Sequence, residues 1–404
     1  MNLSQLDQYE ISQWTAFVPQ LPSATSLPPQ FRQVEELIVD PPLHEAISSL
    51  RLRTKVDGLP LYYWYDFAVL SSTEKKRLLV ILTFVAHGYI WGNGLGPPLD
   101  TLPKQIALPL SYLSKELGIA PLGTYASTVL WNSRRKDPAR GWSLDNVSID
   151  LTFTGTEDES WFYKVSVCVE VAGAQALWSL LSILLEIRQS KPDLGLIQRH
   201  FQKAQASFDE MLATLVETRK MNSEVFYWDI RPNFGGWHLI LPQGVHYAGV
   251  DEASVYRSYV GISAAQSSLF RAFDIIFDIS HSEPGATYLR KMHEYMPSPH
   301  ARFLGDLKAN FSGTLRAFIT DHEELSDTYN QCLRNLAKFR AVHRGLVQKY
   351  AVQEASRPKK RAFGLAKSVT AGGGVQGAGG TPIELFLRST WEKTEKAMVT
   401  KSRL

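Results

Sequence analysis

Apolar residues that recur at helical spacing constrain the fold of this chain more than any other feature. Within residues 326–351, apolar side chains follow one another at intervals of three and four positions, and the same period occurs in residues 196–219 and 267–279. A stripe with this period is buried when it forms one face of an α-helix. Strands are scarce, and we expect residues 226–230 to be irregular or extended. The sequence therefore predicts a mainly α fold.

Prolines divide the chain into two parts. Pairs such as Pro28-Pro29 and Pro41-Pro42 recur through the first hundred residues, and single prolines extend the pattern to Pro109. Such residues break a chain into short helices and turns. At 404 residues the chain is also longer than one core usually supports. We expect a smaller α-rich N-terminal domain over residues 1–112 and a large all-helical domain over residues 113–404.

Charge and cysteine content narrow the classes of partner and compartment. The net charge of +3 gives no support for a nucleic-acid or membrane-surface partner. Cys168 and Cys332 are the two cysteines, which excludes a disulfide framework and fits a reducing compartment. Residues 165–185 are long enough to span a membrane but contain Glu170 and Gln175, so we interpret them as a buried core helix. With no signal peptide in the first twenty residues, we expect a cytoplasmic protein without a membrane partner.

Residues 356–381 form a glycine-rich segment. It starts with a basic cluster and contains six glycines between Gly372 and Gly380. Glycine loses more conformational freedom on ordering than other residues, so we predict a mobile loop. A loop of this kind inside a domain is either a disordered insertion or a lid over a site. Composition leaves both possibilities open.

His343 lies on the apolar stripe of residues 326–351, where it is either a core histidine or a ligand. A haem fits between helices when an apolar face offers an imidazole to the iron. Arg340 lies one helical turn earlier, on the side where it would meet a haem propionate, and we expect Gly345 to thin the helix beside a flat macrocycle. No HExxH, GxSxG, P-loop or strand-linked GxGxxG motif occurs, so hydrolase and nucleotide-dependent functions lack support.

Several segments occur together in a characteristic order. They are 61–67 (LYYWYDF), 86–92 (AHGYIWG), 124–126 (TYA), 160–167 (SWFYKVSV), 263–268 (SAAQSS), 339–343 (FRAVH) and 377–381 (GAGGT). With these segments the chain closely resembles the indoleamine 2,3-dioxygenase family, and especially its fungal members, over nearly its whole length.

The resemblance implies a monomeric, cytoplasmic dioxygenase whose large helical domain binds one haem b per chain. Such an enzyme inserts both atoms of O2 across the indole C2–C3 bond of L-tryptophan and releases N-formylkynurenine, the first step of the kynurenine pathway. It also implies an external electron donor that keeps the haem ferrous, while the cofactor supplies the chemistry that side chains cannot.

The resemblance also implies roles for single residues. His343 matches the proximal iron ligand, and the residues that match positions beside the haem are Arg340, Asp274, Phe270 and Ser263. Phe226 and Arg231 match the residues that hold the indole and the amino-acid carboxylate. The other positions implied for the substrate pocket are Tyr125, Tyr163, Ser166, Ser263, Ala264, Gly380 and Thr381. No side chain is implied as an acid or base, because Ser166 occupies the place of the distal histidine found in other haem proteins.

Two positions depart from the family pattern. Ala378 stands where the loop motif usually has threonine, and Ile262 stands where animal members have glycine. They leave open a haem protein of the same fold that acts on another indole. A second alternative is a protein that only binds oxygen, which would have no use for Phe226 and Arg231.

Overall fold

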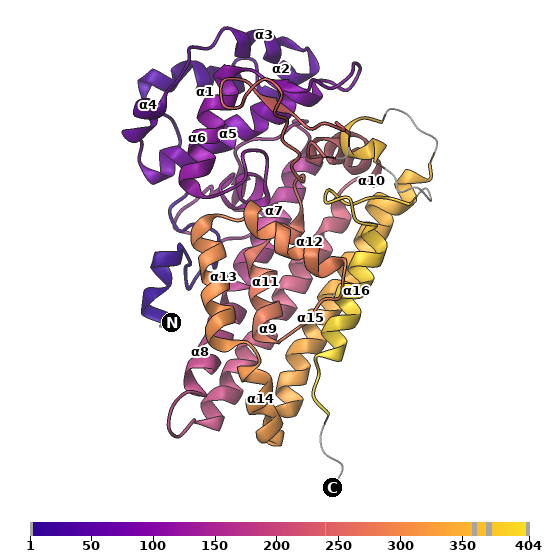
Figure 1. Cartoon of the computed structure of the whole chain (residues 1–404). Helices are drawn as coiled ribbons and strands as arrows, with labels where there is room; N and C mark the ends of the chain where they lie inside the picture. Colours follow the sequence, from indigo (N-terminus) through magenta and orange to yellow (C-terminus); the bar gives the residue numbers. More distant parts are fainter. Residues whose placement is uncertain (1–2, 239, 358–361, 369–373, 401–404) are drawn as a thin grey trace.

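The computed structural model describes residues 3–238, 240–357, 362–368 and 374–400 (Figure 1). The protein is mainly helical, with four short strands in the described residues, so the predicted fold class is confirmed. Strand β1 (Thr101–Leu102) pairs in parallel with β4 (His246–Tyr247), and β2 (Ser133–Arg135) pairs antiparallel with β3 (Val147–Ile149). These two strand pairs lie in the connections between helices. Within the described residues they form no larger sheet.

Helices of different lengths make up the N-terminal part, which lies at one end of the molecule (Figure 1). They are α1 (Arg32–Val39), α2 (Leu43–Ser48), α3 (Arg51–Asp57), α4 (Trp64–Ala68), α5 (Ser72–Trp91) and α6 (Lys104–Leu117). Helix α5 is the central one, and a reciprocal cap between Ser71 and Glu74 starts it. One continuous hydrophobic core contains residues of both predicted domains, so the division at residue 112 stays a prediction.

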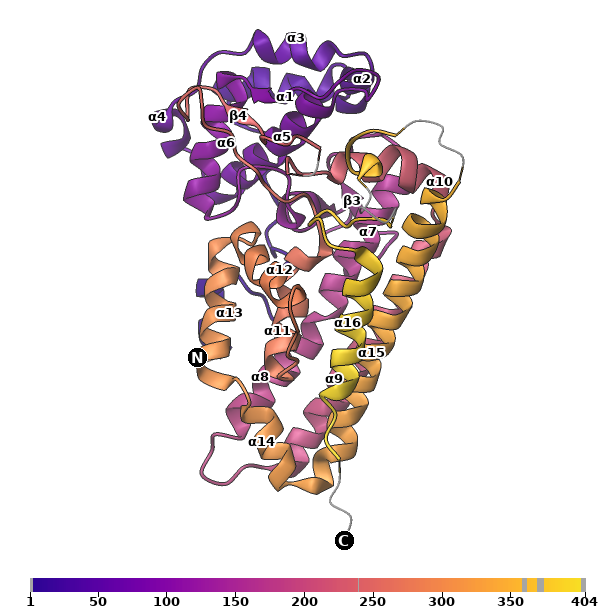
Figure 2. The ribbon, with the colours of Figure 1, turned by 45° about the vertical axis from the view of Figure 1, so that its right-hand side comes forward.

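Helices of three to 23 residues build the rest of the described chain. They are α7 (Glu157–Ala172), α8 (Ala174–Glu186), α9 (Leu194–Val216), α10 (Ser223–Val225), α11 (Ser268–Ile276), α12 (Gly285–Lys291), α13 (Ser298–Phe311), α14 (Thr314–Asp321), α15 (Ser326–Val347) and α16 (Ile383–Lys396). Helix α15 packs between α9 and α16 along the length of the molecule (Figure 2). The apolar stripes meet there, for example where the rings of Phe201 and Tyr329 lie edge to face at 6.3 Å between centroids.

The three predicted helices are confirmed, with different ends. Helix α9 passes into a 3-10 helix at Glu217–Lys220, and α15 passes into a π-helix at Gln348–Gln353. The prediction for residues 226–230 is wrong, because Phe226–Ile230 is a π-helical turn. Its bulky apolar residues favour a strand by propensity, but Tyr227 and Trp228 are buried in a small hydrophobic cluster of their own. Tertiary packing therefore overrides the local preference.

The predicted core helix over residues 165–185 is two helices, α7 and α8. The stretch Glu157–Glu186 is long and apolar enough to cross a membrane by length and composition, yet 78% of its most apolar window is buried inside the protein. Gly173 separates the two helices. A Cβ atom at Gly173 would lie 2.5 Å from Leu269 on α11, so glycine permits the close approach of these helices.

Parts of the glycine-rich segment are described. Residues 358–361 and 369–373 lie outside the described residues, so the predicted mobility of the loop stays a prediction. Between these gaps the chain forms a 3-10 helix at Gly364–Lys367. Further on, the Gly377 N–H donates to the Thr381 carbonyl at 3.0 Å and closes a tight turn.

Candidate functional site

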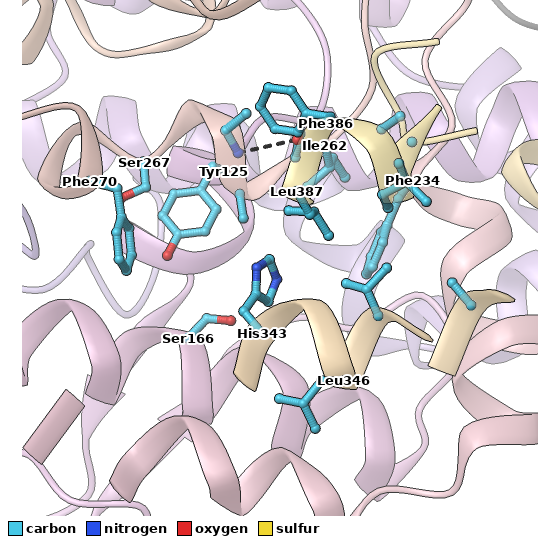
Figure 3. Close-up of a pocket in the computed structure, with 18 of the residues that line it drawn as sticks. Tyr125, Ser166, Phe234, Ile262, Ser267, Phe270, His343, Leu346, Phe386 and Leu387 are labelled. Carbon is cyan, nitrogen blue, oxygen red and sulfur yellow. Dashed lines mark hydrogen bonds between the residues drawn. The ribbon is translucent and has the colours of Figure 1, made fainter. Parts of the chain in front are cut away.

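A cavity of about 330 Å³ lies between α7, α11, α15, α16 and the segment around the π-helix Phe226–Ile230. This volume is in the range of small-molecule and cofactor sites. Figure 3 shows apolar and aromatic side chains around it, with Tyr125, Ser267 and Phe270 on one side and Phe234 on the other. Most of the cavity surface is apolar, so a polar group that faces it is informative.

His343 projects from α15 into the middle of this cavity (Figure 3). Within the described residues, neither nitrogen of its ring has a hydrogen-bond partner. Burial, together with the smaller effect of the charge of Arg340, lowers the pKa of His343 to about 4. The imidazole is therefore neutral near pH 7 and offers a free lone pair.

Within the described residues, the donor groups do not gather into a site for a metal ion held by several side chains. Among the described residues, no group of three or more His, Cys, Asp or Glu side chains is placed to hold a metal ion. A zinc site needs three or four such ligands. A haem iron needs a single imidazole from the protein, which is what His343 provides.

Charged residues gather at the edge of the cavity around Asp274. Its carboxylate accepts hydrogen bonds from Arg340 at 2.6 Å, Arg271 at 2.8 Å and His281 at 2.9 Å. Burial by itself raises the pKa of Asp274, but Arg340, His281 and Arg271 outweigh burial and hold this pKa well below its usual range. Two guanidinium groups against one carboxylate leave a net positive charge, which suits an anionic group such as a propionate.

Phe226 and Arg231 line the same cavity. The Phe226 ring packs against Phe162 at 5.2 Å between centroids. The Arg231 side chain is 4% exposed and donates to two backbone carbonyls, those of Leu365 at 2.8 Å and Gln376 at 2.5 Å. Among the described residues it has no carboxylate partner. Burial lowers the pKa of Arg231 to about 10, and an anionic ligand group would compensate this buried charge.

Ser166 lies on α7 beside His343 (Figure 3). Its hydroxyl group donates to the Phe162 carbonyl, four residues earlier in the same helix, at 3.0 Å. The hydroxyl hydrogen is therefore engaged within the helix. Such a back-bonded serine offers no proton to the cavity.

Most other predicted site residues line the cavity, and two do not. Those that line it are Tyr125, Ser263, Ala264, Phe270 and Thr381. Tyr163 is buried but lies outside the cavity lining, and its hydroxyl group donates to Glu159, one turn earlier on α7, at 3.1 Å. Gly380 is also outside it and closes the loop turn by donating to the Gly377 carbonyl at 2.9 Å.

The prediction for Gly345 is wrong. This residue is exposed, and a Cβ atom there would meet nothing within 4 Å, so it does not thin the helix beside the cavity. It follows His343 by two residues, and a separation of two places residues on different sides of a helix.

Several cavity residues escaped the sequence analysis. Phe162 lines the cavity in place of Tyr163, and its separation of four from Ser166 is a helical signal that selects it. Phe234, Tyr288 and the α16 residues Ile383, Phe386 and Leu387 also line it. No sequence signal marks these residues, because only the packing of segments distant in sequence brings them to the cavity.

Comparisons with known proteins agree on one family. Residues 5–397 match the profile described as Indoleamine 2,3-dioxygenase. The chain is 32% identical to indoleamine 2,3-dioxygenase of Saccharomyces cerevisiae, over 97% of this chain and 93% of that protein. It is 30% identical to human indoleamine 2,3-dioxygenase 2, over 98% and 95% respectively. It is also 30% identical to the 6-hydroxytryptophan 2,3-dioxygenase of Fusarium equiseti, over 95% and 96%.

Proposed function

Because the chain belongs to the indoleamine 2,3-dioxygenase family, we propose that it binds haem b through His343 and converts L-tryptophan to N-formylkynurenine. Its class is that of a dioxygenase, and thus of an oxidoreductase. One observation carries the proposal for the site: an imidazole and a buried guanidinium face the same apolar cavity, and among the described residues the first has no hydrogen-bond partner and the second no carboxylate.

The residues of the cavity fit a haem. His343 would be the proximal ligand, since its ring nitrogens are free of other described residues. The rings of Phe270 on α11 and Phe339 on α15 pack in a tilted arrangement, with 5.0 Å between centroids, and would form part of the apolar wall. Arg340 and Arg271 would stand near the propionates, with Asp274 fixing both guanidinium groups.

Bound haem would supply dioxygen binding and the redox chemistry that side chains lack. The chain's own residues bind and orient the substrate. Phe226 and Phe162 offer aromatic faces to the indole ring. Arg231 is a fixed fork for the amino-acid carboxylate, and a fork supplies charge and orientation together.

Other residues around the cavity limit the access of protons and water to the substrate. The Ser166 hydroxyl group is bonded to its own helix, so no proton relay runs through it. Residues 374–381 border the cavity through Ala378 and Thr381, and a segment that covers the cavity there would keep water from the reacting atoms.

The setting of the enzyme belongs to the same proposal. We infer a cytoplasmic monomer that depends on an external electron donor to keep the haem ferrous. Both cysteines are free and buried, as suits a reducing compartment.

Oxygenation of another indole is a second candidate. The relative from Fusarium equiseti is named a 6-hydroxytryptophan 2,3-dioxygenase and is as similar to this chain as the human protein is. Ile262 lines the cavity in the place where animal members have glycine, so the cavity differs from theirs at that wall.

A turnover assay on the haem-loaded protein tests the proposal. L-Tryptophan and 6-hydroxytryptophan are given separately with ascorbate and methylene blue, and the ring-opened product is followed by absorbance. We expect N-formylkynurenine, and a higher kcat/KM for L-tryptophan. A higher kcat/KM for 6-hydroxytryptophan would favour the second candidate. Reversible oxygen binding without turnover of either indole would show an oxygen-binding protein instead.

A further inference from the structure

Glu170 is a buried acid directly behind the wall of the cavity. It lies on α7 and its side chain is fully buried. Its Oε1 atom accepts hydrogen bonds from the Tyr125 hydroxyl at 3.0 Å and from the Ser267 hydroxyl at 2.5 Å. Both donors line the cavity, where Figure 3 shows them next to each other beside Phe270. Glu170 thus touches the cavity only through these two side chains.

The carboxyl group has no compensating charge. Its Oε2 atom is buried and has no hydrogen-bond partner within the described residues. Among those residues no cation forms an ion pair with it, and no charged group is among the causes that shift its pKa. A buried carboxylate without a cation is costly, and an apolar side chain there would usually give a more stable fold. The acid therefore calls for a functional explanation.

Tyr125 is held at both of its ends. Its backbone N–H donates to the Gln266 side chain at 2.9 Å, and the same side chain donates to the Gly261 carbonyl at 2.8 Å. Its hydroxyl group is held by Glu170. Gln266 and Ser267 are adjacent, so one short segment and one acid together fix the position of this ring. Rigid support of this kind is what orients a group in a binding site.

We propose that Glu170 is a positioning residue of the dioxygenase site, which holds Tyr125 and Ser267 in the cavity wall through its carboxyl group. This inference rests on the function proposed above. Burial raises the pKa of Glu170 to about 7, while the hydrogen bonds from Ser267 and Tyr125 limit the rise. Burial also raises the pKa of Tyr125 far above its usual value, so the phenol stays a donor when Glu170 ionises.

The direction in which pH should change the KM for L-tryptophan follows from the charge of Glu170. Below about pH 7 the acid is uncharged and suits its apolar surroundings. Above it, an uncompensated charge lies behind Tyr125 and favours entry of water into that wall. We therefore expect the KM for L-tryptophan to rise several-fold as the pH increases through about 7, with little change in haem content.

The variant Glu170→Gln tests this directly. Its amide oxygen still accepts from Tyr125 and Ser267, but the group no longer titrates. KM and kcat for L-tryptophan are measured from about pH 6 to about pH 9, together with the shift of the haem absorption on substrate binding. We expect the midpoint near pH 7 to disappear from both the KM and the binding curve. A midpoint identical to that of the unmodified protein would overturn the proposal.

Glu159→Gln is the matched control. Glu159 is the other fully buried acid of α7, and it also accepts from a tyrosine, Tyr163. It is satisfied by the N–H groups of Phe153 and Thr154, and Tyr163 does not line the cavity. This variant should keep the midpoint of the unmodified protein. If Glu159→Gln abolishes the midpoint as Glu170→Gln does, the effect comes from general loosening of α7 and the proposal is wrong.

A second variant covers the case in which Glu170→Gln does not fold. Tyr125→Phe keeps the ring and removes one hydrogen bond that lowers the pKa of Glu170, so the midpoint should move to higher pH. An unmoved midpoint would contradict the inference. The haem-to-protein ratio and turnover of the unmodified protein are measured first. If these are absent, the proposed function itself fails, which is a different result from an unmoved midpoint.

Discussion

Single side chains define the site through the partners they lack. Buried polar groups in proteins are nearly always hydrogen-bonded, and exceptions often mark function. His343 has no partner within the described residues, and Arg231 has only backbone carbonyls where a carboxylate would satisfy its charge. Both side chains face one cavity, so ligands bound in that cavity would supply the partners that both side chains lack.

Replacing His343 by alanine should abolish stable haem binding, because no other described histidine lines the cavity. The measurement is the Soret absorbance and the haem-to-protein ratio of the purified variant. His246→Ala is the control, since His246 is a half-buried residue of strand β4 that bonds to the Val255 carbonyl and does not line the cavity. An unchanged Soret band in His343→Ala would show that another residue holds the iron.

Arg231→Ala should raise the KM for L-tryptophan at least about tenfold, because a charge-assisted hydrogen bond contributes roughly 1.5–3 kcal/mol. Arg231→Lys should not restore binding, since an ammonium group cannot reproduce the fork. Haem content should stay unchanged in both variants. A KM equal to that of the unmodified protein in Arg231→Ala would place the substrate carboxylate elsewhere.

Ser166→Ala should keep kcat within a few-fold of the unmodified enzyme, since its hydroxyl hydrogen is already bonded to Phe162. Loss of kcat by several orders of magnitude, with haem binding intact, would mean that a proton does pass through Ser166. General acid–base catalysis contributes about 10²–10⁴-fold, so the two outcomes are well separated.

Among the elements, the turn Gly377–Thr381 decides how the glycine-rich loop meets the cavity. Gly379 lies directly against the ring of Tyr288, and a Cβ atom there would overlap that ring. Tyr288 cannot move freely, because its hydroxyl group donates to Ser263 at 3.1 Å and its ring packs edge to face on Phe386. A glycine at this position therefore permits the loop to seat against α12 and α16.

Gly379→Ala should weaken substrate binding by displacing this turn, with a KM increase of several-fold and unchanged haem content. Gly377→Ala is the matched control, because a Cβ atom there would meet no atom closer than 3.8 Å. Hydrogen exchange across the loop, with and without L-tryptophan, provides a second measurement. Equal KM values in the two variants would show that the contact with Tyr288 does not matter.

Across the whole molecule, the cavity lies where segments distant in sequence meet. Its walls come from α7, α11, α15, α16 and the chain around Tyr125 and Arg231, so a bound ligand ties them together. His87 and Trp237 pack against each other in the core near this junction. One ring nitrogen of His87 bonds to the Asn233 carbonyl at 2.9 Å, and the other accepts from the Gly123 N–H at 3.0 Å.

Removal of haem should therefore lower the Tm by several degrees. A ligand that binds only the folded state stabilises it by about 2.7 kcal/mol at a hundred times its Kd. Calorimetry of the haem-free and haem-loaded protein measures the shift, and His343→Ala should show none on addition of haem. A haem-free protein that melts at the same temperature as the loaded one would contradict the proposed site.

The sequence by itself determined the fold class, three of the helices and the identity of the family. Apolar stripes over residues 196–219, 267–279 and 326–351 predicted α9, α11 and α15, because helical period is a local property. Motifs such as FRAVH and SAAQSS carried the resemblance, and most of the residues that it selected line the cavity. They could not decide between neighbours such as Phe162 and Tyr163, where one step along a helix turns a side chain through about 100°.

Only the tertiary structure decided which distant side chains meet. In the sequence Glu170 is a polar residue inside an apolar stretch, and in the structure it is the acid that supports Tyr125 and Ser267. The π-helix at Phe226–Ile230 and the α16 residues of the cavity were also beyond prediction. The reason is physical: helix formation depends on neighbours in sequence, whereas the burial, pairing and pKa of a side chain depend on packing between segments.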